Sequence, residues 1–348
     1  MLIYIINTDL EIERAFDITK SVIWNNRYYG YGEFEVYMQA TMETVESFKI
    51  GKILVREGSE ENAMIIESIQ IQTDNEAGDY ITIKGRCLKS ILYRRIIWNQ
   101  TNIMGSLEGG IERLLKENAI QPENNKRKIE WLNNKNVLKT GITVKCQYTG
   151  NNLGETIEAL CKSYLLGWDI ALNLEDKTME FYLYRGSNRS WSQQEHPCVV
   201  FSEDYENLST TDYTIDQSNY KNVAKVAGEG EGLERKYMEI GTARGLERCE
   251  IFVDARDLST NEGEITEEEY NRQMEDRGLQ SLAENAITKE FSGEILEFTN
   301  IYGRDYFLGD IVEVQNKYGI GATARITEVI ESEDESGTYT IPTFEFDE

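Results

Sequence analysis

Short stretches in which apolar and polar residues alternate occupy both ends of the chain, and they constrain its fold more than any other feature. In GEFEVYMQA, Phe34, Val36 and Met38 fall on one side of an extended backbone, and the residues between them are mostly acidic. A period of two is typical of a strand with one buried and one solvated face. Similar runs, punctuated by Gly, Asn and Asp, fill residues 1–85 and return from about 293. The sequence therefore predicts small barrel-like or sandwich-like β units.

Between these ends the period changes to that of a helix. Apolar residues recur three and four positions apart in GSLEGGIERLLKENAI and in NNLGETIEALCKSYLLGWDI. Ser106 and Asn152 stand where N-caps are expected. A longer helix is predicted near 266–288, where Thr266 and Glu269 have capping-box spacing. The run WDIALNLEDKTMEFYLYRG is typical of a hairpin. The fold class is therefore α+β and rich in strands, and the sequence shows no strong internal repeat.

The charge balance limits what the protein can bind. The chain of 348 residues has 62 Asp and Glu against 36 Lys and Arg, a formal net charge of -26. Broad nucleic-acid binding depends on clustered cations, so this balance argues against it. An acidic wall can still lie beside DNA and let it slide past by repulsion. No apolar run approaches the roughly 20 residues that span a bilayer, and the N-terminus does not resemble a secretory signal.

Residues for catalysis or metal binding are scarce. The chain has five cysteines and no CxxC pair, and its single histidine, His196, stands beside Pro197. A structural zinc site needs closely spaced soft ligands, so we predict no metal site and expect the cysteines to be reduced and buried. No serine lies in a GxSxG motif, and nothing activates Cys198 as a partner of His196. We therefore expect no enzyme activity, no catalytic residue and no cofactor.

Two further segments resemble ligand loops only superficially. The run GEGEG, from Gly228 to Gly232, lacks the spacing of a phosphate-binding loop, and its two glutamates would repel phosphate. Residues 257–268 begin and end with an acid, as a calcium loop does, but the glycine stands one place late, at Gly263. We interpret the first as a strand exit or chain crossover and the second as a loop that leads into a helix cap.

A purely basic segment interrupts this acidic chain. KGRCLKSILYRRIIWNQ, residues 84–100, has five cations and no acid. Three explanations compete. The cations could be solvated or paired with local acids; they could contact nucleic acid, although the aromatic residues beside them are few; or arginine forks could meet the acidic face of a neighbouring copy.

The sequence resembles the tail-hub proteins of long-tailed bacteriophages and prophages. The resemblance rests on four runs in the same order: ITIKGRCLKSILYRRIIW, NLGETIEALCKSYLLGWDI, VVFSEDYENLSTTDYTIDQSNYKNVAKVAGEGEG and DYFLGDIVEV. In that family the first run closes a β domain, the third returns the chain to it, and an LGD turn opens a strand of the last domain. The resemblance spans nearly the whole chain and transfers no catalytic residue.

The resemblance implies a non-enzymatic structural hub of a phage tail tip or baseplate. It implies a homotrimer whose two β-barrel-like domains per subunit form a ring of pseudo-sixfold symmetry, with an α+β insertion domain. The ring would lie below the hexameric distal tail protein, with the tape-measure protein and tail fibre or receptor-binding proteins as further partners. DNA would pass through its lumen without specific binding. The protein would be made in the bacterial host cytoplasm and reside in the virion, without inserting in a membrane.

The resemblance leaves alternatives. A hub of a contractile injection particle would carry the same motifs. A cell-wall-degrading or glycan-binding tail accessory protein is the alternative from another class. Because the chain ends soon after its last predicted strand, we expect lytic or receptor-binding activity to reside on separate proteins.

A domain layout follows from the same motifs. The first β-barrel domain is predicted to comprise residues 1–95 completed by about 200–228. Residues 96–199 form the α+β insertion domain, and 229–348 form the second β-barrel domain with its helix. Strands near 210–227 should then pair with the first domain.

The layout also yields a prediction for the basic segment. Apolar residues at helical spacing, Leu88 and Leu92 among them, should turn a short helix toward the core and leave Lys89 outward. Arg86, Arg94 and Arg95 are predicted to be subunit-interface residues, because arginines placed between acidic subunits turn repulsion into attraction.

Overall fold

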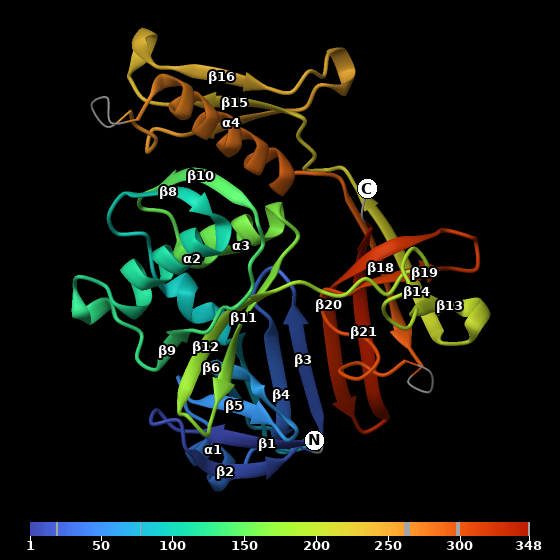
Figure 1. Ribbon diagram of the computed structural model, residues 1–348. Helices are drawn as coiled ribbons and strands as arrows, with labels where there is room; N and C mark the ends of the chain where they lie inside the picture. Colours follow the sequence, from blue (N-terminus) through green and yellow to red (C-terminus); the bar gives the residue numbers. More distant parts are fainter. Residues whose placement is uncertain (19, 77, 261–264, 297–299, 347–348) are drawn as a thin grey trace.

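The computed structural model describes all residues except 19, 77, 261–264, 297–299 and 347–348. The molecule is elongated and consists of four parts, each with its own buried apolar core (Figure 1). A first β unit lies at one end and a small α+β unit at the other, and the insertion and a second β unit lie between them.

The first β unit is formed by the N-terminal strands. They are β1 (Leu2–Ile6), β2 (Ile12–Asp17), β3 (Ser21–Arg27), β4 (Glu33–Gln39), β5 (Ile53–Arg56), β6 (Ser59–Gln72) and β7 (Tyr80–Cys87), with helix α1 (Met42–Ser47) after β4. Their order in the sheet is β3-β4-β7-β6-β5-β1-β2. The predicted alternation is confirmed in β4, where Phe34, Val36 and Met38 are buried. These residues join a core that contains Trp24 and Ile83.

The insertion follows a short 3-10 helix, η1 (Leu88–Arg94). It contains β8 (Thr101–Ser106), α2 (Leu107–Leu115), η2 (Lys116–Ile120), η3 (Asn125–Arg127), β9 (Leu132–Asn134), β10 (Thr143–Tyr148), α3 (Leu153–Ser163), β11 (Gly167–Asn173) and β12 (Thr178–Tyr184). The predicted caps are confirmed: Ser106 Oγ accepts from Gly109 N, and Asn152 Oδ1 accepts from Glu155 N. The predicted hairpin is β11–β12.

The second β unit is formed by strands from the last third of the chain and by two strands that precede them in the sequence. They are β13 (Val200–Ser202), β14 (Leu208–Asp216), β18 (Thr288–Ile295), β19 (Ile311–Gln315), β20 (Gly321–Asp334) and β21 (Gly337–Phe346), with η4 (Glu203–Tyr205) after β13. Its core contains Phe201, Phe291 and Phe344, together with Tyr28 from the first unit.

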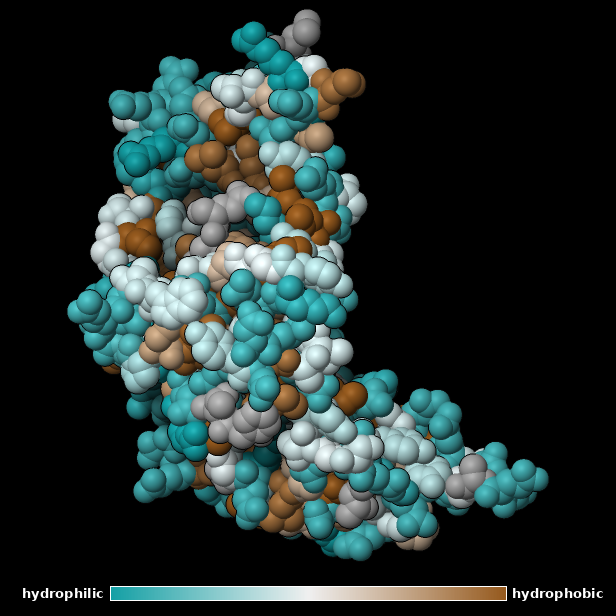
Figure 2. Space-filling view, turned by 90° about the vertical axis from the view of Figure 1, so that its right-hand side faces the viewer, coloured by the Kyte–Doolittle hydropathy of each residue, from teal (hydrophilic) through white to brown (hydrophobic). Residues whose placement is uncertain are grey.

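A small α+β unit interrupts the second β unit between β14 and β18. It consists of β15 (Val223–Ala227), β16 (Tyr237–Ile240), β17 (Glu250–Asp254) and α4 (Glu267–Glu284), with η5 (Gly232–Glu234) and η6 (Gly245–Glu247) in its loops. Helix α4 begins at the predicted capping box of Thr266 and Glu269. It packs on the sheet through Tyr270 and Met274. Hydrophobic residues gather mainly in the upper half of the view in Figure 2, toward this end of the molecule.

The two β units are joined into one sheet. Strand β20 pairs antiparallel with β3, and Glu328 stands opposite Arg27. Among the described residues the combined sheet has 13 strands. Its longest continuous path runs β14-β18-β21-β20-β3-β4-β7-β6-β5-β1-β2. The junction therefore connects segments about 300 residues apart in the sequence.

The predicted pairing of residues 210–227 is wrong. Strand β14 pairs with β18, and β15 pairs with β16 and β17, so all of these partners lie beyond residue 229. The sequence pattern identified these segments as strands, but an alternating pattern does not specify a partner. Division of the chain into the three predicted domains, and the barrel form of its β units, stay predictions.

The two β units repeat one topology. In chain order, β3, β4, β6 and β7 take the spatial order β3-β4-β7-β6, and β14, β18, β20 and β21 take the order β14-β18-β21-β20. Each long third strand is preceded by a short one, β5 or β19, with which it forms a hairpin. The same arrangement of strands therefore occurs twice in the chain.

The hydrogen bonds and bulges repeat as well. Gly51 N donates to Ile66 O and Gly309 N to Ile326 O, both at 2.8 Å. The register then slips by one residue directly after both isoleucines. A bulge at the same place in both strands is a specific feature, because bulges interrupt an otherwise regular ladder. The two units are therefore structurally equivalent, with Ile66 matching Ile326.

Candidate functional site

One face of the main sheet points away from the cores of both β units, and we call it the outer face. Residues directly opposite each other on neighbouring strands share a face. Starting from Glu328 and following the pairing register outward, the outer face includes Asp212, Thr214 and Asp216 of β14, Glu290 and Ser292 of β18, Thr343 of β21, Glu328 and Asp334 of β20, Arg27 of β3, Glu33 and Glu35 of β4, Lys84 and Arg86 of β7, and Ser68, Gln70 and Gln72 of β6. It spans eight strands, four from each β unit.

The outer face is acidic. Each of the three cations named above is already held by a carboxylate. Arg27 Nε lies 2.9 Å from Glu328 Oε1, and Lys84 Nζ lies 2.5 Å from Glu35 Oε2. Arg86 is held by Glu67, as described below. The acidic residues named on the face outnumber these cations, and they include Asp212, Asp216 and Glu290. The face as a whole therefore repels polyanions.

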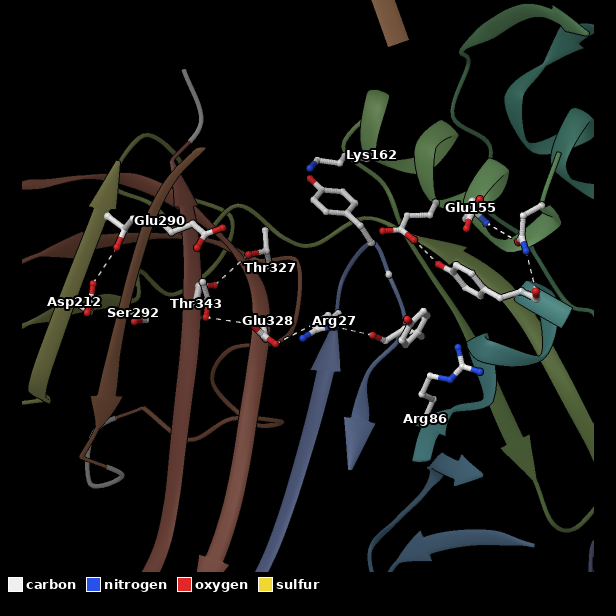
Figure 3. A pocket seen from close by; sticks show the side chains of 17 residues that line it. Arg27, Arg86, Glu155, Lys162, Asp212, Glu290, Ser292, Thr327, Glu328 and Thr343 are labelled. Atoms are coloured by element: carbon white, nitrogen blue, oxygen red, sulfur yellow. Dashed lines mark hydrogen bonds and ion pairs between the residues drawn. The ribbon is translucent and has the colours of Figure 1, made fainter. Parts of the chain in front are cut away.

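A cleft of about 720 Å³ opens where the outer face meets the insertion. Figure 3 shows Asp212, Glu290 and Thr343 on the sheet at one side and Glu155 and Lys162 on α3 at the other. Its lining consists of carboxylates, hydroxyls, amides, a few cations and three tyrosines. Such a lining suits contacts through charge and hydrogen bonds, and the cleft places three parts of the molecule around one space.

Contacts among its lining residues hold two tyrosines of the cleft against α3 and Arg86. The Tyr93 hydroxyl bonds to Glu158, and burial raises the pKa of Tyr93, so the phenol stays protonated as a donor. Asn152 Nδ2 donates to Tyr93 O at 2.8 Å. The ring of Tyr31 lies edge-on to Tyr93, with the Arg86 guanidinium 4.8 Å from the Tyr31 ring centroid. The basic segment therefore joins the first β unit to the insertion.

Two of the three predicted interface arginines bind the same carboxylate within the chain. Arg86 donates to both oxygens of Glu67, at 2.6 and 2.9 Å, and Arg94 Nη2 donates to Glu67 Oε1 at 2.8 Å. These bonds, those of Arg86 first, hold the pKa of Glu67 below its usual value. Arg95 Nε donates to Arg127 O at 2.8 Å. Local pairing accounts for these contacts, and a role between subunits stays a prediction.

The expected outward position of Lys89 is wrong. Its side chain is 2% exposed and passes under the loop between β3 and β4. Lys89 Nζ donates to Arg27 O at 2.6 Å, Gly30 O at 3.1 Å and Tyr28 O at 3.4 Å. The segment is a 3-10 helix with three residues per turn, so Lys89 lies on the same side as the buried Leu92. An α-helical period would have placed it outward.

The cysteines and the histidine belong to no metal-binding group among the described residues. All five cysteines are free; Cys87 and Cys161 are buried as predicted, but Cys198 is exposed. His196 is exposed, and its backbone N–H donates to Gln193 Oε1. Among the described residues no group of three or more His, Cys, Asp or Glu side chains could hold a metal ion. No helix of the described chain is long and apolar enough to cross a bilayer.

His196→Ala should leave the protein unchanged. The imidazole is exposed and the bond at this position is made by the backbone, so we expect a change in unfolding free energy within about 0.5 kcal/mol. Chemical denaturation would measure it, and particle assembly should proceed as in wild type. A loss of assembly in the folded variant would contradict the absence of a role for His196.

The run GEGEG and residues 257–268 are the two segments that resemble ligand loops in the sequence. GEGEG directly follows β15, and Gly230 adopts a φ of +96°, which supports the interpretation as a strand exit. Gly263 and its neighbours lie outside the described residues. The end of that segment is the N-cap of α4, as expected for a loop that leads into a helix.

Sequence reasoning missed the outer face as a continuous surface. The alternation in β4 gave its acidic side, but only the register shows that eight strands contribute to it. The acidic residues of β14 belong to the same face because β14 pairs with β18.

Comparison with known proteins gives a consistent result. The family model for Siphovirus ReqiPepy6 Gp37-like proteins matches residues 2–344. A tail protein from Neisseria meningitidis MC58 is similar in structure, with a TM-score of 0.61, 13% identity, and coverage of 99% of this chain and 96% of that one. The 43 kDa tail protein of prophage MuSo2 from Shewanella oneidensis has a TM-score of 0.59 and 13% identity, with 99% of this chain and 98% of that one covered.

A third structure, the prophage tail protein gp18 from Listeria monocytogenes EGD-e, has a TM-score of 0.52 and 11% identity, with 99% of this chain and 94% of that one covered. No curated protein sequence matches the chain significantly. At these identities the structural likeness concerns the fold.

Proposed function

The chain belongs to the family of Siphovirus ReqiPepy6 Gp37-like proteins, and we propose that it is a structural, non-enzymatic component of a phage tail. The family match covers nearly the entire sequence, and three solved structures that share the fold over 99% of the chain are tail proteins, two of them from prophages. Its location is accordingly the virion.

Within the tail, the protein acts as the hub of the tail tip. One observation carries this proposal: the two β units each contain an equivalent set of four strands, and the two sets are joined edge to edge. Three such chains place six equivalent units in a ring, which gives a homotrimer the pseudo-sixfold symmetry that matches a hexameric distal tail protein. Closure of the tail tube and contact with the tape-measure protein follow from that position.

The outer face of the sheet lines the channel of this ring. The cations named on it are neutralised by carboxylates of the same chain. Its remaining acids lie among neutral Thr, Ser and Gln side chains. DNA that must slide through a narrow passage encounters repulsion and no cluster of unpaired arginines to bind its phosphates. The acidity of the chain then serves passage of DNA.

The trimer is directly testable. Light scattering of the purified chain after size-exclusion chromatography should give a mass three times that of the 40.1 kDa chain. Negative-stain images should show rings with a central opening. A monomer at concentrations of tens of micromolar, with the native circular dichroism spectrum, would overturn the hub assignment, while a tail role would remain.

We also propose that Arg86, Arg94 and Arg95 help to join subunits. Arg94 remains 45% exposed while it bonds to Glu67, so it retains donors for a neighbour. Arg94→Glu/Arg95→Glu should therefore raise the dissociation constant of the trimer at least tenfold, as measured by sedimentation at several concentrations.

The exposed pair Lys126→Glu/Lys128→Glu changes the charge equally and serves as the control. If the arginine variant forms trimers as readily as this control does, the arginines act only in local pairing with Glu67 and Arg127.

A further inference from the structure

The joint between the two β units inside the chain has a counterpart that the single chain leaves open. In the described part of the chain, β14 is the terminal strand of the main sheet path and has no strand on its outer edge. The second half of β6 is also open. Strand β5 covers only Ser59–Ile65 of β6, and Ser68–Gln72 pair on one side only, with β7. Each equivalent unit thus has one edge used in the chain and one unused.

The used edges define a rule for joining units. Strand β20 is the third strand of the second unit, and its second half pairs with β3, the first strand of the first unit. The unused edges belong to the third strand of the first unit, β6, and the first strand of the second unit, β14. They are the same two kinds of edge, so β6 of one copy can join β14 of another as β20 joins β3.

Apolar side chains on the core-facing side of the two unused edges lack cover. Ile71 of β6 is 46% exposed and Ile215 of β14 is 51% exposed. At the joint inside the chain, the core-facing Val329 and Trp24 are fully buried. Exposed isoleucines in an open edge strand invite pairing with another strand. A second copy would bury them as the internal joint buries its own residues.

The charges of the two unused edges are also compatible. On the outer face, β14 presents Asp212 and Asp216, and the end of β6 presents the neutral Ser68, Gln70 and Gln72. Next to Ser68, Glu67 is neutralised by Arg86 and Arg94. An acidic strand thus meets neutral and basic groups, whereas two β14 edges would bring like charges together.

The equivalence of the units fixes the register. Ile66 matches Ile326, and one residue of bulge later Ser68 matches Glu328. Phe34 and Phe291 match because they stand opposite Gly85 and Phe344, the partners of those two isoleucines.

The first strands are matched in the same way. Trp24 opposes Phe34 and Tyr213 opposes Phe291, so Trp24 matches Tyr213 and Arg27 matches Asp216. Inside the chain Arg27 opposes Glu328 and Asn25 opposes Ile330. The corresponding pairs between copies are Asp216 with Ser68 and Thr214 with Gln70.

We propose that β6 of one subunit pairs antiparallel with β14 of the next, with Gln70 opposite Thr214, Ser68 opposite Asp216 and Gln72 opposite Asp212. The contact is head to tail and uses two different edges, so it closes into a ring when the rotation per chain divides a full turn. The inference rests on the proposed trimer and specifies which backbone strands hold it together. It makes the sheet continuous around the channel.

A disulfide tests this register. In a Cys198→Ser background, Gln70→Cys/Thr214→Cys places two cysteines opposite each other, where Cα atoms lie about 5 Å apart, within disulfide reach. Inside one chain these positions are separated by seven strand spacings of about 4.8 Å each, too far to bridge. Oxidation should yield a covalent trimer on a non-reducing gel, and reduction should return single chains.

Matched controls isolate the register. Gln70→Cys/Thr210→Cys moves one partner four residues along β14 and should remain uncrosslinked, as should either single variant. Suppose that both double variants are trimeric by light scattering. If the Thr214 variant does not crosslink, whether or not the Thr210 variant does, the proposed register is wrong and the hub proposal is unaffected. A monomeric wild-type chain overturns both.

Ile71→Asp gives a second measurement. Ile71 is exposed in the single chain, so the charge should leave thermal unfolding of the monomer nearly unchanged. In the proposed joint the aspartate would be buried beside the apolar edge of β14. The dissociation constant of the trimer should therefore rise at least a hundredfold. A trimer as stable as that of Lys126→Asp, an exposed substitution elsewhere, would overturn the proposed joint.

Discussion

Replacing Lys89 by Met should destabilise the first β unit and its junction with the insertion by about 3 kcal/mol or more. The ammonium is buried and donates to three backbone carbonyls of the β3–β4 loop. Methionine fills a similar volume but donates nothing, and a buried acceptor left without a donor costs about 1–3 kcal/mol. Urea unfolding followed by tryptophan fluorescence would measure the loss, because Trp168 lies against the same lysine.

The matched control is Lys84→Met in the same basic segment. Lys84 is 54% exposed and pairs with Glu35 on the surface, so its replacement should cost at most about 1 kcal/mol. Equal effects of the two substitutions would show that the carbonyls of residues 27–30 find other donors, and Lys89 would then be an incidental buried cation.

Replacing Asp310 by Ala should destabilise the second β unit by about 3–5 kcal/mol. Asp310 is 2% exposed and its carboxylate accepts from Ser187 N at 2.7 Å, Arg189 Nε at 2.6 Å and Phe307 N at 3.0 Å. Removal of the carboxylate leaves the mostly buried Arg189 guanidinium without its partner. Chemical denaturation would give the free energy, and limited proteolysis should show early cleavage near residues 186–190.

Asp17→Ala is the control for this substitution, because Asp17 is 73% exposed and its effect should stay within about 0.5 kcal/mol. A loss below 1 kcal/mol for Asp310→Ala would contradict the assigned role. The preceding Gly309 contributes to the same turn: its φ is +92°, and a Cβ there would lie 2.2 Å from the Tyr28 ring. The LGD sequence is thus explained by packing and hydrogen bonding.

Local signals in the sequence predicted α2, α3, α4 and the β11–β12 hairpin, but helix α1 was missed. Ser106, Asn152 and Thr266 cap helices because a side-chain oxygen can reach the third backbone N–H, a relation that depends only on nearby residues. Local signals did not predict which strands pair with each other. β14 pairs with β18 across the whole small α+β unit, and no local pattern in either strand specifies the other.

The residues alone showed no equivalence of the two β units, which only the family resemblance implied, and there is a physical reason. The equivalence consists of strand order, backbone hydrogen bonds and a bulge, all of which side chains of different kinds can support. Lys52 and Asp310 occupy the same place in the two hairpins, since each carbonyl accepts from the matching isoleucine N–H. A lysine and an aspartate there share no chemistry that a sequence comparison could detect.

The joint between β20 and β3 also bears on how the chain folds during synthesis. Its two strands are separated by about 300 residues, so β3 emerges from the ribosome long before its partner exists. Strands β3, β4, β6 and β7 can form their own sheet early, because their partners lie within the first 90 residues. Until residues 321–334 are made, the outer edge of β3 is an unprotected template.

That interval exposes the nascent chain to pairing with the wrong copy. β20 of another chain fits the edge of β3 as well as the chain's own β20 does, and the product would be a strand-swapped oligomer. Chains made on one polysome emerge close together, which raises this risk further. The order of translation, with the closing strand last, therefore makes the yield of correctly closed subunits sensitive to synthesis rate and to chaperones that cover a sheet edge.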